Sequence, residues 1–258
     1  LHTFNRPTST VMSGRWLCSR VRLEAVPSIL GQLSVEFLSQ ERQSEVRAIA
    51  EKQQKTYRQM LSANKNKTFA IHAIHNLHRQ IDELVTRVQA RPDVHFDCKP
   101  GCSHCCNFRI EVFPPEVFVL ARRLRALPGD QLSLVTERLR LHVQRSQGVP
   151  RAQHWMNCPL LNDDRCSVYE DRPSTCRKYL SLDVEECKRP GISALEDGEL
   201  ALKSLALVSG VREAYSKAKS PLSIHELGEA LLIALTDSTC EERWFKGEIV
   251  FPLMAEDD

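Results

Sequence analysis

The sequence predicts a mainly α-helical protein with a small β component, in which a cysteine-rich core of short strands and loops is flanked by N- and C-terminal helices. Apolar residues step by three and four over residues 71–88 and again over 205–215, the spacing of one buried helical face. Between these stretches lie eight of the ten cysteines, among Pro-Gly turns and short alternating runs. That middle part has the pattern of loops and short strands.

Four segments follow from composition. Residues 1–30 are a predicted disordered leader, 31–92 a helical hairpin, 93–190 a cysteine-cluster domain and 191–258 a C-terminal helical segment. The first acid is Glu24, after several arginines, so a transit peptide or an over-extended reading frame with its true start at Met12 are the alternatives. Cys18 lies in this leader and has no predicted role.

The predicted hairpin breaks near Asn64–Asn66, where asparagines can end one helix and begin another. It ends at Arg91, because the residue before a proline resists helical geometry. Three histidines in the second helix suggest a metal site, but only His78 touches the apolar stripe, so solvated or structural roles are favoured for His72, His75 and His78.

Thiols dominate the chemistry of the middle segment. Four of them fall within nine residues around a Pro-Gly turn, at Cys98, Cys102, Cys105 and Cys106, and three more follow at Cys158, Cys166 and Cys176. Thiolates are strong ligands for zinc and for iron–sulfur clusters, so this pattern predicts a metal-binding core. Disulfides are less favoured because the chain is long enough for an ordinary core. A thioredoxin-like pair at 102–105 lacks the preceding strand.

The doubled cysteine adds a constraint. Neighbouring side chains point to opposite faces of a strand or diverge around a helix, so Cys105 and Cys106 are not expected to bind the same small ion. We therefore expect either two metal centres or one centre plus a thiol that faces elsewhere. Lys99, His104 and Arg109 lie near these thiols and should offset their negative charge.

Short elements are predicted around these thiols. Alternation over 108–112 indicates a half-buried strand, and helices should begin at 114 and after 129. A polar turn at 162–165 predicts a hairpin that brings Cys158 near Cys166. Cys176 should lie in the first turn of a helix, and Arg172 and Arg177 either neutralise the site, hold its loops, or are merely exposed.

The C-terminal segment reads as core rather than as a cofactor pocket. A capping box at Ser223–Glu226 should open a helix with Leu227, Leu231 and Leu235 inward. Trp244–Phe251 should pack as a terminal strand or turn, and Cys240 stands alone.

The cysteine quartet, the following Cys158-Pro-Leu-Leu and the segment Tyr169-x-x-Arg172-Pro-x-x-Cys176-Arg177 together resemble the YkgJ-like family of zinc- or iron-chelating cysteine-cluster proteins, which includes flagellin lysine N-methylase. The resemblance covers about residues 93–180. It implies metal ligation by Cys98, Cys102, Cys105, Cys106, Cys158, Cys166 and Cys176. Cys187 is an eighth candidate that lies past the matched pattern. Iron–sulfur and zinc are implied about equally.

Other classes of function are less consistent with the sequence. A formal charge of +2 gives no footprint of a nucleic-acid binder, and no run of eighteen apolar residues could span a membrane. Nucleotide-binding and protease motifs are missing from the sequence. The spacing 98-102-105 also coincides with the radical S-adenosylmethionine signature, but no strand–helix repeat follows it.

Two hypotheses remain. The first is an iron–sulfur or zinc protein whose centre reacts, as an oxidoreductase or, by resemblance, as a lysine N-methylase-like enzyme with a protein substrate or redox partner. The second is a zinc-stabilised interaction module without catalysis, because a fully thiolate-ligated zinc has no open position. Reduced vicinal thiols predict a cytoplasmic location.

Overall fold

The computed structural model describes residues 39–64, 66–99, 101–189 and 196–254. The predicted leader, with Cys18, lies outside these residues. The helical elements are α1 (Gln40–Ala63), α2 (Lys67–His72), α3 (Ile74–Gln89), η3 (His104–Asn107), α4 (Pro114–Arg125), α5 (Gly129–Ser146), η4 (Arg151–Gln153), η5 (Tyr169–Asp171), α6 (Ser174–Lys178), η6 (Glu186–Lys188), α7 (Gly198–Lys217), α8 (Leu227–Thr236) and α9 (Cys240–Phe245). The strands are β1 (Glu111–Val112), β2 (Leu161–Asn162), β3 (Arg165–Cys166) and β4 (His225–Glu226). The predicted mainly helical fold with a small β component is confirmed.

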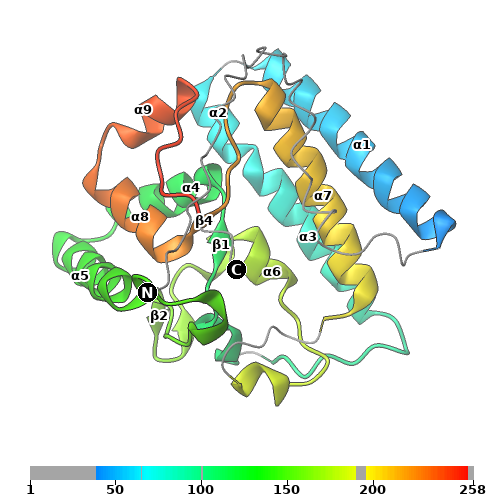
Figure 1. Cartoon of the computed structure of the whole chain (residues 1–258), viewed down its shortest axis with the longest axis horizontal. Helices are drawn as coiled ribbons and strands as arrows, with labels where there is room; N and C mark the ends of the chain where they lie inside the picture. Colours follow the sequence, from blue (N-terminus) through cyan, green and yellow to red (C-terminus); the bar gives the residue numbers. More distant parts are fainter. Residues whose placement is uncertain (1–38, 65, 100, 190–195, 255–258) are drawn as a thin grey trace, which may run out of the picture.

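The N-terminal helices share a layer with a C-terminal one. α1 ends at Ala63, and Asn66 caps α2 by accepting a hydrogen bond from the Thr68 N–H, so the break predicted at the asparagines is confirmed. However, α7 packs along α1 and also against α3, and Figure 1 shows it between them. The two helices of the predicted hairpin, α1 and α3, are thus separated by α7, which comes from the C-terminal part of the chain.

Two buried tyrosines fix this layer to the junction between α2 and α3. Tyr57 of α1 donates its hydroxyl hydrogen to the Ala73 carbonyl at 3.0 Å, and Tyr215 of α7 donates to the Ala70 carbonyl at 2.5 Å. Both rings are fully buried. Each hydroxyl therefore has a hydrogen-bond acceptor near the junction of α2 and α3, and the rings add apolar area to the core.

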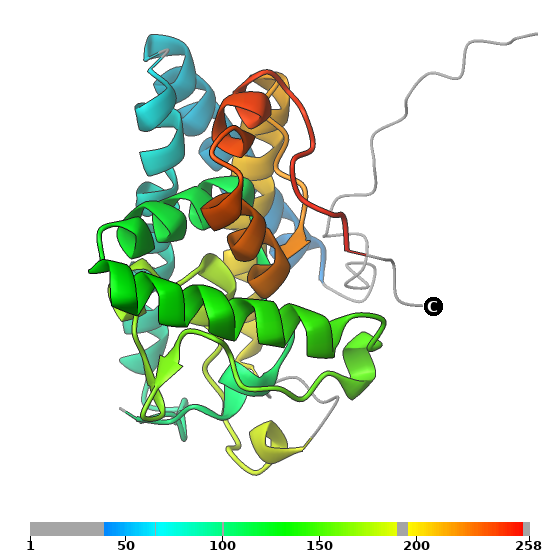
Figure 2. The same ribbon diagram turned by 90° about the vertical axis from the view of Figure 1, so that its left-hand side faces the viewer.

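A second group of helices covers the other side of the core. α4 contacts α2 and α8, α8 also contacts α5, and α6 packs against α3. The short helices η3 and η6 and the β2–β3 hairpin lie toward the lower end of the molecule in Figures 1 and 2, away from α9, and α6 lies above them, nearer the centre. The long helices thus pack into one helical unit, and the cysteine-rich core lies at one end of this unit.

The β component is smaller than predicted. The strand expected over 108–112 is limited to Glu111–Val112, which pairs antiparallel with His225–Glu226. This pairing also moves the predicted start of the last large helix, because residues 223–226 are extended and Ser223 bonds the His225 ring. The cap is Glu226, whose carboxylate accepts the N–H groups of Gly228 and Glu229. Trp244 lies in helix α9, not in a terminal strand.

The closest helix–helix approach depends on a glycine. A Cβ placed on Gly210 of α7 would lie 2.3 Å from the Ala50 carbonyl oxygen and 3.0 Å from the Gln54 nitrogen of α1. Both are backbone atoms of a helix and cannot move aside cheaply. A side chain at 210 would therefore push α1 away from α7.

We expect Gly210→Ala to destabilise the protein by about 1–3 kcal/mol, because overpacking outweighs the gain in helix propensity. Gly198→Ala in the same helix is the matched control, since a Cβ there meets nothing within 4 Å. Urea unfolding of both variants tests this. Equal midpoints for Gly210→Ala and wild type would contradict the close packing described here.

Candidate metal centre

The first cysteine loop is held by the segment that follows α6. Asp97 donates its N–H to the Ser181 carbonyl at 2.9 Å and accepts the Val184 N–H on its carboxylate at 3.0 Å. The Ser181 N–H donates to the Cys98 sulfur at 3.2 Å. Gly101 has a φ of +89°, a conformation that favours glycine, at the turn before Cys102. The loop therefore presents Cys98 toward residues 181–187.

Cys105 and Cys106 lie together in the 3₁₀ turn η3. Contact with the Cys106 thiol is the largest cause of the raised pKa of Cys105, followed by burial. The two thiols are therefore neighbours, and the prediction that they do not bind the same ion stays a prediction. It assumed a strand or an α-helix, whereas the two residues lie in a 3₁₀ turn.

The two cysteine groups meet at a backbone hydrogen bond. The Cys158 N–H donates to the Cys106 carbonyl at 2.8 Å, and the Met156 N–H donates to the Asn107 carbonyl at 3.1 Å. These bonds align the chain before the second group with the turn that carries the first. Cysteines far apart in sequence are therefore adjacent in space.

A two-residue hairpin presents Cys166. β2 and β3 pair antiparallel with Leu161 opposite Cys166, and the turn residues Asp163 and Asp164 have φ of 47° and 58°. Positive φ at both central positions is typical of the tightest hairpin turns. The predicted hairpin is confirmed, although Cys158 precedes the strand rather than lying in it.

Cys176 and Cys187 complete the set. Cys176 is the third residue of α6, as predicted, and Cys187 is buried in η6 with its thiol 3.9 Å from the Asp183 carbonyl oxygen. The part of the chain that the structure describes contains nine cysteines, and all are free thiols.

Burial and mutual repulsion act on these thiols together. Burial raises the pKa of Cys158 to about 12 and that of Cys176 well above its usual value. Neighbouring thiols raise both further, because each thiolate would repel the next. Metal binding must therefore displace protons from these sulfurs.

The effects of neighbouring thiols on each pKa divide the cysteines into two groups. The pKa of Cys98 is raised by burial and then by Cys102, Cys105 and Cys187. The pKa of Cys176 is raised by burial and then by Cys158, Cys105 and Cys166. Cys105 is common to both groups, so it lies where they meet.

The thiols lie in the same region but are not arranged around a single metal position. Over residues 39–64, 66–99, 101–189 and 196–254, no three histidine, cysteine, aspartate or glutamate side chains lie close enough to enclose one metal ion. Sulfur is nevertheless the donor that zinc and iron–sulfur centres prefer, and the neighbouring thiols supply it. The donor set thus fits these metals, and small side-chain and loop movements would be needed to enclose one.

The arginines beside the site hold its loops. Arg177 is buried and donates to the Asp82 carboxylate at 2.5 Å, to the Arg172 carbonyl at 2.9 Å and to the Glu170 carbonyl. Arg172 stacks over Tyr169, with its guanidinium carbon 4.0 Å from the ring centroid. Positive charge still reaches the thiols, because Arg172 and Arg123 counteract part of the burial that raises the pKa of Cys166.

Sequence reasoning missed a buried acid–base pair beside Cys176. The His78 ring nitrogen Nε2 lies 3.0 Å from a carboxylate oxygen of Glu116, and both side chains are buried. His78 thus has the structural role predicted for it. The sequence signal for Glu116 was its place in the first turn after two prolines, where a glutamate often accepts a backbone N–H.

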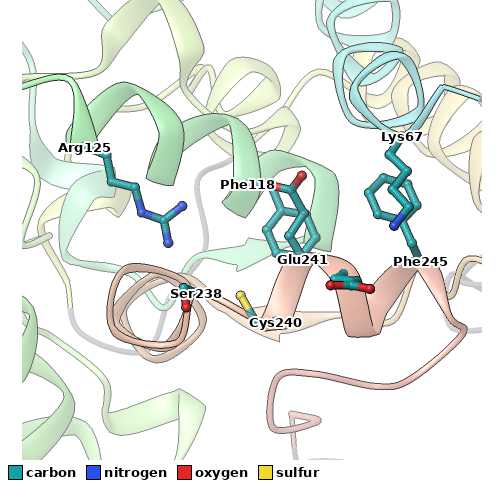
Figure 3. A pocket seen from close by; sticks show the side chains of 8 residues that line it. Lys67, Phe118, Arg125, Ser238, Cys240, Glu241 and Phe245 are labelled. Carbon is teal, nitrogen blue, oxygen red and sulfur yellow. The ribbon is translucent and has the colours of Figure 1, made fainter.

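Two cavities lie outside the thiol cluster. One of about 310 Å³ is lined by α4 and α9, and Figure 3 shows Arg125 and Lys67 at its two sides with Cys240 on the wall. A second, of about 380 Å³, is lined by His75, His78 and Arg177 together with six other residues. The first lies against the C-terminal segment, and the prediction that this segment is core rather than a cofactor pocket stays a prediction. None of the candidate cysteines lines either cavity.

The described helices offer no candidate for crossing a bilayer, since none is both long and apolar enough. No curated protein and no solved structure matches the chain, so the predicted relation to flagellin lysine N-methylase stays a prediction.

A family model does match the middle of the chain. It spans residues 97–193, is named CxxCxxCC and is described as a "putative zinc- or iron-chelating domain". All eight candidate cysteines fall within it, although the first interval here is three residues, one longer than the name indicates. Residues 97–193 of this chain are therefore similar to the CxxCxxCC zinc- or iron-chelating domain.

Proposed function

We propose that this protein binds zinc or iron, as ions or as an iron–sulfur cluster, through the thiols of its cysteine domain. The observation that carries the proposal is the hydrogen bond from Cys158 to Cys106, which brings the two cysteine groups together. The description of the matched family supports the same chemistry. Thiols of this number and crowding have no comparable use in packing alone.

The ligands would form two centres that meet at the paired cysteines. One set would be Cys98, Cys102 and Cys187, since Cys102 raises the pKa of the other two, and the other set would be Cys158, Cys166 and Cys176, since the first two raise the pKa of Cys176. Cys105 and Cys106 lie between the two sets and would supply one thiol to each. Eight thiols are enough for two four-thiolate centres of zinc or of iron–sulfur type.

A structural role for the metal is favoured by how little regular structure holds these segments. From residue 147 to 189 the described chain contains only short helices and two-residue strands. Such a segment buries little apolar surface of its own, so bound metal would supply folding free energy. This observation favours the zinc-stabilised module as the second candidate, with the helical body offering the surface for a protein partner.

Oxidoreductase and lysine N-methylase-like activity remain the finer alternatives. An iron–sulfur centre with charge-transfer absorption would favour them, whereas colourless protein with stoichiometric zinc would favour the module. Either centre requires reduced thiols, which is why we also propose a reducing compartment such as the cytoplasm.

The metal content of the purified protein tests the proposed binding. Protein purified without oxygen should contain stoichiometric zinc or iron, and Cys176→Ser should lose at least one metal equivalent because a ligand is removed. Cys240→Ser is the matched control, since Cys240 is also a free thiol but lies on α9, away from the cluster. Elemental analysis measures both. Equal metal in Cys176→Ser and wild type would contradict the proposal.

The second prediction concerns metal removal. Adding a strong chelator should lower the melting temperature, because metal that binds the folded state adds its binding free energy to stability. Readdition of the metal should restore it. Differential scanning fluorimetry measures the shift, and Cys176→Ser should show a smaller one. Identical melting with and without chelator, in protein from which the metal has been shown to leave, would exclude a structural metal.

A further inference from the structure

Glu116 is a buried carboxylate that joins three helices. Its side chain is 1% exposed. It accepts the N–H of Phe113 at the start of its own helix at 2.9 Å, and the N–H of Ser174 at the start of α6 at 2.7 Å. His78 of α3 lies 3.0 Å from the oxygen that also receives the Ser174 hydrogen. The carboxylate thus ties together α3, α4 and α6.

The charge of this carboxylate is stabilised by its donors. Burial alone would raise the pKa of Glu116, but the hydrogen bond from His78 and the Ser174 N–H bring it below the ordinary value. Each carboxylate oxygen accepts a backbone N–H group. In a glutamine side chain the NH₂ group would replace one of these oxygens, and it would then face an N–H donor instead of an acceptor. Few substitutions could therefore preserve the contact with α6.

The helix that Glu116 holds carries a candidate ligand. Ser174 is the first residue of α6 and Cys176 is the third. The thiol of Cys176 is influenced by Cys158, Cys105 and Cys166, and also by Glu116 itself. On the next residue, Arg177 binds Asp82 of α3. A helix of only five residues is therefore held at its first residue and again beside Cys176.

We propose that Glu116 is a positioning residue for the metal centre, which acts through the Ser174 N–H to hold α6, and with it Cys176, in place. Glu116 is not a ligand in this proposal. The inference rests on the proposed function, because it assigns a role toward the metal that the cysteines would bind. Hydrogen bonds behind a ligand typically change metal affinity by roughly 10–100-fold.

Ser174→Pro tests this directly, because it deletes the N–H that Glu116 receives and places the ring Cδ where that hydrogen pointed, so the carboxylate oxygen 2.7 Å from the nitrogen must move away. Proline suits the first position of a helix, and the preceding Pro173 already has the extended ψ of 160° that a following proline requires. Ser174→Ala is the matched control, since it removes only the hydroxyl and keeps the N–H.

The probe is Co²⁺ titrated into metal-free protein without oxygen, in competition with a chelator of known affinity. Thiolate-to-cobalt absorption reports how many sulfurs bind. We expect Ser174→Pro to weaken Co²⁺ binding roughly tenfold or more and to lower the thiolate absorption per bound ion. Ser174→Ala should match wild type in both.

A second pair of variants separates positioning from stability. Glu226 is also buried, also caps a helix through two N–H groups, and lies 3.7 Å from His142, but its helix α8 carries no candidate thiol. Its charge raises the pKa of Cys158, so neutralising it does not by itself weaken metal binding. Glu116→Gln and Glu226→Gln should both lower the melting temperature. Only Glu116→Gln should weaken Co²⁺ binding and change the thiolate absorption. Ser174→Pro decides the question if Glu116→Gln fails to fold.

The outcomes are distinguishable. Wild-type protein that takes up no Co²⁺, Zn²⁺ or iron would overturn the proposed function, and this inference with it. Stoichiometric binding by wild type, with unchanged affinity and absorption in Ser174→Pro and Glu116→Gln, would overturn the inference alone. The same loss of affinity in Glu226→Gln would also overturn it, because the effect would then follow stability rather than the contact with α6.

Discussion

The cysteine end of the molecule depends on a charge buried in its interior. An ionised carboxylate out of water is tolerated only when hydrogen bonds replace its hydration, and Glu116 obtains these from an imidazole and two backbone N–H groups. Because the donors come from α3, α4 and α6, satisfying one charge fixes the relative positions of three helices. Apolar packing alone is non-directional and would tolerate small shifts of a helix as short as α6.

The remaining cysteine segments are placed by backbone hydrogen bonds as well as by the burial of Phe108, Leu160 and Val168 in the core. Asp97 is bonded to the chain at 181 and 184, and Cys158 to Cys106. These bonds set where each segment runs but leave the thiols free to rotate. This explains how the thiols can be neighbours without any three enclosing a metal ion in the described chain. The scaffold sets which sulfurs can meet, and binding would have to bring them into contact.

The sequence predicted well what depends on local patterns. Periodicity located the faces of α3, α5 and α7, and asparagine and proline signals located the break before Asn66 and the start of α4 at Pro114. The turn at Asp163–Asp164 and the place of Cys176 in α6 also followed from short motifs. In each case the residues that form the element are also the residues that signal it.

What the sequence could not predict depends on contacts between distant segments. The insertion of α7 between α1 and α3 requires the close approach at Gly210, which no periodicity reveals. The pairing of β1 with β4 extends Ser223–Glu226 and so moves the cap of α8. The pairing of His78 with Glu116 joins residues 38 positions apart. A helical wheel places His78 at the edge of its apolar stripe but does not identify the carboxylate opposite it.

The raised thiol pKa values bear on how such a centre would assemble. Buried, crowded thiols hold their protons, so a metal must compete with those protons as well as with water. That cost is smaller when the sulfurs are already held near one another, because less chain entropy is lost on binding. Cys176 is the thiol with the firmest support, on a helix anchored by Glu116 and Arg177, while Cys98 and Cys102 lie on a loop. The anchored sulfurs would therefore form the preorganised side of the site, and the loop sulfurs would close over the metal.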